Sequence, residues 1–110
     1  MESACKGAKD AGGMTIGILP GKDKTEANPY VDIPIVTAMS HARNAIIVRT
    51  ADLLIAIGGK YGTLSEIALA KVIDKPVIGV GTWDIPGMIR VKTVEEAMEK
   101  VEKIVRKLGS

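Results

Sequence analysis

Short runs of apolar residues alternate along the chain with longer segments of helical character. The strand-like runs are apolar throughout, which is typical of strands in a parallel sheet that is covered on both faces. Strand alternating with helix predicts an α/β fold, a three-layer sandwich with a parallel sheet between helices. The predicted strands cover residues 14–19, 53–57 and 77–80, with less regular candidates at 33–36 and 88–91, and the 53–57 run is expected at the centre of the sheet.

The C-terminal segment contains the clearest helix. Thr93 is followed three residues later by Glu96, the spacing of a capping box, and apolar residues then recur on one face. Acidic residues begin this segment and basic residues end it, as the helix dipole favours. Further helices are predicted over residues 2–11, 40–50 and 63–73.

Length and composition limit the classes of function. A chain of 110 residues is expected to form a single domain, residues 1–110, and 46% hydrophobic residues suffice for a core. The 15 basic and 13 acidic residues are scattered, which argues against nucleic acid and anionic membranes as partners. Cys5 is the only cysteine and no apolar run is long enough to span a bilayer, so a reducing cytoplasm is the expected location.

A glycine-rich segment separates the 53–57 strand from the helix that follows it. In this context Gly58, Gly59 and Gly62 let the backbone approach an anion, while the Thr63 hydroxyl and the first-turn amides donate hydrogen bonds to phosphate. The spacing fits neither a Walker A loop nor the dinucleotide fingerprint. The alternative is a tight turn without a ligand, but the helix amino terminus favours the anion site.

Charged residues on either side of this segment are candidates for chemistry. Glu66 completes a capping box with Thr63, and it could also contact a sugar or stabilise an oxocarbenium-like transition state. Arg43 could form a forked contact with a phosphate. The alternative is an ordinary surface residue, which is the more common role of an arginine. His41 is the only histidine and has no clustered ligands around it, so neither a metal ion nor a resident cofactor is expected.

Two aromatic residues lie close to the predicted strand ends. Trp83 follows the 77–80 strand, and Tyr61 lies within the glycine-rich segment. Each could stack on a heterocyclic base or simply pack against the protein, and packing is the more common role of such residues.

The segment that runs from Gly58 to Glu66, preceded by Ala42-Arg43-Asn44, resembles the Lonely Guy (LOG) family, once mislabelled as lysine decarboxylases. The resemblance extends from residue 1 to about residue 80 and is greatest for the branch of molybdenum-cofactor carrier proteins. It implies a Rossmann-like parallel sheet flanked by helices. It also implies phosphate binding by Gly58, Gly59, Gly62, Thr63 and Arg43, and catalysis by Glu66 with Arg43 in those members that are hydrolases.

Two departures from the motif of the hydrolases make binding without hydrolysis the favoured function. The chain has Ile57 where they usually carry proline, and Asn44 where they carry lysine. The resemblance thus implies a protein that binds a nucleotide or a related phosphorylated small molecule. The alternative is a nucleoside 5′-monophosphate phosphoribohydrolase, which cleaves the N-glycosidic bond.

The resemblance also predicts an N-terminal truncation. In the family an earlier strand, a helix and a second strand ending in a glycine-rich turn precede the segment similar to residues 1–4. Without them the sheet would have a gap beside the 53–57 strand. We therefore expect a fragment or a mis-set start, or a chain that closes the gap by rearranging or by pairing with a second copy, and hence a homo-oligomer.

Overall fold

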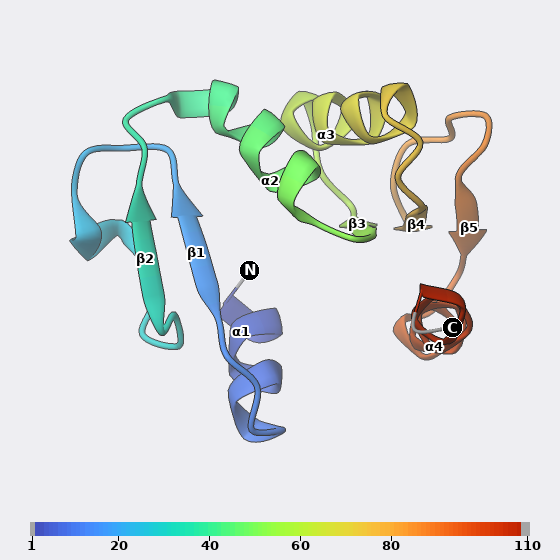
Figure 1. The fold of residues 1–110 in the computed structure, drawn as a ribbon, viewed down its shortest axis with the longest axis horizontal. Coiled ribbons are helices and arrows are strands. Elements are labelled where there is room, and N and C mark those ends of the chain that lie inside the picture. The colour runs from blue at the N-terminus through green and yellow to red at the C-terminus, as the bar shows by residue number, and fades with distance from the viewer. Residues whose placement is uncertain (1, 109–110) are drawn as a thin grey trace. The chain divides into compact units, whose positions relative to one another are not determined.

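The computed structural model describes residues 2–108, except for the side chain of Leu108. The chain divides into two compact units at the junction between Arg43 and Asn44. The strands of both units are parallel and are accompanied by helices, so the predicted α/β class is confirmed (Figure 1). They form a two-stranded and a three-stranded hydrogen-bonded sheet.

The first unit is built around strands β1 (Ile16–Leu19) and β2 (Ile33–Val36), which pair in register from Ile16 opposite Ile33 to Leu19 opposite Val36. Pro34 lies within β2, at a place where only one side of the strand is paired. Proline donates no ladder hydrogen bond, so an edge strand is where it is tolerated. The remaining elements of this unit are helix α1 (Glu2–Asp10) and the 3-10 turns η1 (Lys24–Glu26) and η2 (Ser40–Arg43).

A polar network ties α1 to the segments before the two strands. Asp32 accepts a hydrogen bond of 2.6 Å from the Lys9 ammonium and one of 2.8 Å from the Thr15 backbone amide. The Thr15 hydroxyl in turn accepts from the backbone amide of Asp32 at 2.8 Å. These bonds lower the pKa of Asp32, first through the Lys9 contact and then through the Thr15 amide.

The second unit contains a parallel sheet in the order β3 (Leu54–Ile57), β4 (Val77–Val80), β5 (Ile89–Val91). The expectation that the 53–57 strand is central is wrong within this sheet, because β4 is the strand with a neighbour on each side. Ile57 at the end of β3 is 61% exposed, in keeping with an edge position. Three helices complete the unit, α2 (Asn44–Thr50), α3 (Tyr61–Val72) and α4 (Val94–Leu108).

Successive residues of β4 contribute to different clusters on opposite faces of this sheet, as the pleat of a strand requires. Val77 joins a core with Val48 of α2 and Ile67 of α3. Ile78 joins a second core with Ala97 of α4. The second unit is therefore a three-layer sandwich, with α2 and α3 on one face and α4 on the other (Figure 1).

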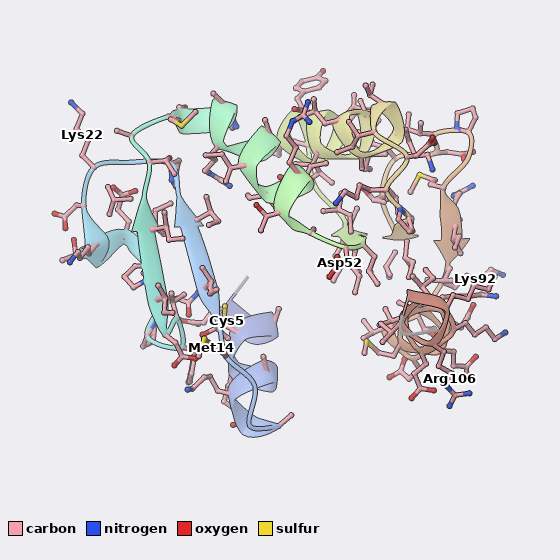
Figure 2. The ribbon with its side chains drawn as sticks, in the orientation of Figure 1. Cys5, Met14, Lys22, Asp52, Lys92 and Arg106 are labelled. Carbon is pink, nitrogen blue, oxygen red and sulfur yellow. The ribbon has the colours of Figure 1, made fainter. Side chains whose placement is uncertain are left out.

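The predicted helix boundaries are correct at the C-terminus and less so elsewhere. The Thr93 hydroxyl accepts a hydrogen bond of 3.1 Å from the Glu96 amide, which confirms Thr93 as the cap of α4. Arg106 extends from α4 on the side away from the strands (Figure 2). The predicted 40–50 helix is a 3-10 turn followed by the shorter α2, and Ser40 has a φ of 49° that an α-helix does not accommodate.

Candidate functional site

The glycine-rich loop begins where β3 ends. Gly58 and Gly59 have φ values of 55° and 94°, which place both in conformations that side-chain-bearing residues rarely adopt. The Gly58 amide donates to the Val80 carbonyl at 3.1 Å, so the loop continues the β3–β4 ladder by one bond. A Cβ at Gly59 would collide with Oγ1 of Thr63, whereas a Cβ at Gly58 would meet no atom within 4 Å. The loop is thus packed against its helix at Gly59 and open at Gly58.

Helix α3 starts at Tyr61, two residues earlier than the sequence predicted, and Lys60 is its N-cap. The predicted capping box is wrong, because Thr63 is the third helical residue and Glu66 lies in the second turn. The left-handed glycines turn the chain early, so the helix begins before a threonine cap is reached. The Lys60 side chain makes no capping hydrogen bond, and the geometry of a helix leaves the first amides without intrahelical partners. Such amides can bind an anion.

Two residues that follow β4 form hydrogen bonds with the backbone of the glycine-rich loop. The Thr82 hydroxyl donates a hydrogen bond of 2.5 Å to the Gly58 carbonyl. The Trp83 indole nitrogen donates one of 2.9 Å to the Lys60 carbonyl. The same indole packs against the core between α2, α3 and the sheet, so the expected packing role of Trp83 is confirmed. The carbonyls on both sides of Gly59 are therefore fixed by residues distant in sequence.

Asn44 is a polar residue near this loop that sequence reasoning did not select. It is the first residue of α2 and only 1% exposed. Its Nδ2 donates to the Gly62 carbonyl at 3.4 Å, while its Oδ1 is buried and has no hydrogen-bond partner among residues 2–108. A buried acceptor without a partner costs about 1–3 kcal/mol and is often explained by function. The only feature of the sequence that could have pointed to Asn44 as a site residue was its position beside Arg43.

The second unit brings together Gly58, Gly59, Gly62 and Thr63 at the amino-terminal end of α3. Glu66 lies one turn further along the same helix and is half-buried. Arg43 is the last residue of the first unit, at the end of η2, so its participation in the site remains a prediction from sequence. Its Nε is buried and donates to no partner among the residues described.

The part of the chain that the structure describes offers neither a metal site nor a membrane-spanning helix. Within residues 2–108 no group of three or more histidine, cysteine, aspartate or glutamate side chains is arranged to hold a metal ion. None of the helices in that range combines the length and the apolar character that crossing a bilayer requires.

The fold and the loop define a Rossmann-like α/β protein with a glycine-rich strand-to-helix turn. The sequence profile of the SLOG cluster4 family matches residues 1–108, and the chain belongs to this family. A protein of Archaeoglobus fulgidus described as uncharacterized is 48% identical over 99 residues, which cover 89% of this chain and 65% of that relative. The chain thus spans just under two thirds of the length of this relative.

Solved structures similar to this chain include proteins connected with the molybdenum cofactor. The molybdenum cofactor binding protein from the phototrophic bacterium Rippkaea orientalis is 40% identical, with a TM-score of 0.87 over 96% of this chain and 71% of that one. The molybdenum cofactor carrier protein from Chlamydomonas reinhardtii is 38% identical, with a TM-score of 0.81 over 94% of this chain and 69% of that one. The branch that the sequence resembled most is therefore the one found among these structures.

Proposed function

We propose that this chain binds a phosphorylated small molecule, a nucleotide or a related phosphoribosyl ligand, with its phosphate at the loop of residues 58–63. The observation that carries the proposal is the amino-terminal end of α3. Two left-handed glycines lead into it, and the side chain of its N-cap residue, Lys60, makes no capping hydrogen bond. First-turn amides, which have no intrahelical partner, and the helix dipole both favour a phosphate at this point.

Neighbouring groups support this arrangement. The side of Gly58 on which a Cβ would lie is free of protein atoms within 4 Å, so a ligand can approach the backbone closely there. The Thr63 hydroxyl is in the first turn and supplies a further donor. The orphaned Oδ1 of Asn44, on an amide held by Gly62, is the kind of unsatisfied group that accompanies binding sites.

The solved relatives suggest a specific ligand. Two of them are named for binding or carrying the molybdenum cofactor, at 40% and 38% identity to this chain. Carriage of the molybdenum cofactor is accordingly our preferred instance of the proposed function. This chain covers 71% and 69% of those two proteins, so part of each of them has no counterpart in the aligned region.

Hydrolysis of a nucleoside 5′-monophosphate is the second candidate, and the LOG resemblance supports it. Glu66 would then stabilise positive charge that develops on the sugar as the N-glycosidic bond breaks. The Glu66→Gln variant separates the two functions. A binding protein keeps most of its affinity with this variant, whereas a hydrolase loses turnover by orders of magnitude, measured as release of free base from AMP or GMP.

The first test is the thermal midpoint of unfolding in the presence of AMP, GMP, ribose 5-phosphate, inorganic phosphate or isolated molybdenum cofactor. Ligand at 100 times its Kd adds about 2.7 kcal/mol to the stability of the native state. We expect an increase with at least one phosphorylated compound and its loss in Gly62→Val, which places a β-branched side chain in the first turn of α3. An unchanged midpoint with all five compounds contradicts the proposal.

Three remaining elements of the proposal rest on sequence alone. The family resemblance assigns Arg43 to the phosphate, and loss of ligand affinity in Arg43→Ala tests that role. A homo-oligomer is expected, and light scattering of the purified chain with and without ligand measures it. Cytoplasmic location is expected as well, and fractionation of cells that express the protein tests it.

A further inference from the structure

The residues beside the glycine-rich loop include an aromatic pair that the phosphate does not require. The rings of Tyr61 and Trp83 are stacked, with centroids 6.0 Å apart and an interplanar angle of 30°. Such spacing is within the range of favourable aromatic pairs. Tyr61 nevertheless remains 79% exposed, so its contact with Trp83 covers only a small part of the ring.

Trp83 holds this pair in a fixed place. Its indole nitrogen donates to the Lys60 carbonyl at 2.9 Å, and the ring packs against the hydrophobic core. A tryptophan held by both its polar and its apolar parts has little rotational freedom. The stack therefore restricts Tyr61 before any ligand binds, which lowers the entropic cost of using its open face.

We propose that the exposed face of Tyr61, backed by Trp83, stacks on a planar heterocycle carried by the phosphorylated ligand. This inference rests on the proposed function, because Tyr61 is the first residue of the helix whose amides hold the phosphate. A ring joined to that phosphate through a sugar or a short linker reaches Tyr61 without leaving the loop. The pair thus selects phosphate esters that bear a flat aromatic ring over those that bear only a sugar.

The experiment compares GMP and AMP with ribose 5-phosphate by titration calorimetry on the intact chain. Aromatic stacking on a base is worth about 5- to 150-fold in affinity. We expect both nucleotides to bind more tightly than ribose 5-phosphate by a factor in that range. Tyr61→Ala removes the ring but keeps the backbone amide, so it should abolish this preference by weakening the binding of the nucleotides more than that of ribose 5-phosphate. The matched control Tyr61→Phe keeps the ring and should keep the preference.

Fluorescence provides a second readout, because Trp83 is the only tryptophan of the chain. Stacking of a heterocycle on the pair should alter its emission with GMP or AMP, and ribose 5-phosphate should leave it unchanged. The inference is overturned if Tyr61→Ala weakens the binding of all three ligands equally, or if it weakens the binding of none of them. Equal affinity of the wild-type chain for nucleotides and ribose 5-phosphate overturns it too and leaves the proposed function standing, whereas absence of all binding overturns both.

Discussion

The indole nitrogen of Trp83 donates a hydrogen bond of 2.9 Å to the carbonyl oxygen of Lys60, the N-cap residue of α3. Together with the bond of 2.5 Å from Thr82 to Gly58, it connects the segment after β4 to the loop after β3. Carboxyl ends of parallel strands meet at one edge of a sheet, so loops that follow neighbouring strands can support each other. The geometry of the glycine-rich loop therefore depends on a segment more than twenty residues away.

The two left-handed glycines should differ in their tolerance of substitution. Gly59→Ala forces a Cβ against Thr63 and holds a non-glycine residue at a φ of 94°, so we expect a loss of at least about 3 kcal/mol. Gly58→Ala is the matched control, since it has open space and a φ of 55° and should lose only about 1–2 kcal/mol. Urea unfolding measures both, and equal losses would contradict the packing of Gly59 on Thr63.

The bond from Thr82 to Gly58 should contribute measurably to stability. Thr82→Val keeps the shape of the side chain but leaves the Gly58 carbonyl without its hydroxyl donor, which should cost about 1 kcal/mol in the free energy of unfolding. Thr82→Ser keeps the hydroxyl and serves as the control for the lost donor. If valine and serine variants unfold at the same urea concentration, the hydrogen bond does not stabilise the loop.

Stability of the first unit should depend on pH through Asp32. The Lys9 ammonium and the Thr15 amide lower the pKa of Asp32 in the folded chain, so its ionised form stabilises the fold above the ordinary pKa of an aspartate, about 3.9. This contribution is lost as the pH falls from that value through the lowered pKa. We expect Asp32→Asn to reduce the thermal midpoint at pH 7 and to flatten its decline in acid.

Asp10 offers the matched control for that experiment. It forms an exposed ion pair of 3.7 Å with Lys6 on the same helix, and such pairs contribute little to stability. Asp10→Asn should leave both the midpoint at pH 7 and its acid decline close to those of the wild type. Equal behaviour of the two variants would show that the network around Asp32 has no special role.

The core between α2, α3 and the sheet should be sensitive to truncation. Ile67 is 0% exposed, and Ile67→Ala removes buried methyl groups and leaves a cavity, at a cost of about 2–5 kcal/mol. Val72 lies on the same helix but is 81% exposed, so Val72→Ala should change stability by no more than about 0.5 kcal/mol. Thermal unfolding of both variants checks the difference, and a comparable loss in Val72→Ala would indicate that its side chain is covered in solution.

Sequence patterns predicted those features whose causes are local. The apolar 77–80 run became β4 with the predicted boundaries, and Thr93 caps α4 as its spacing with Glu96 indicated. The glycine-rich segment was also located correctly between a strand and a helix. The start of α3 was wrong because the same Thr-x-x-Glu spacing occurs at Thr63, where two glycines had already turned the chain into the helix.

The sequence by itself determined the class of fold, the elements and the position of the glycine-rich loop, because periodicity, glycines and caps act between residues a few positions apart. Only the tertiary structure decided that β4 is central in its sheet and that Thr82 and Trp83 hold the loop. It also decided that Asn44 is buried against Gly62. Those relationships depend on which segments pack together, and neither the polarity nor the spacing of neighbouring residues specifies a partner across a sheet edge.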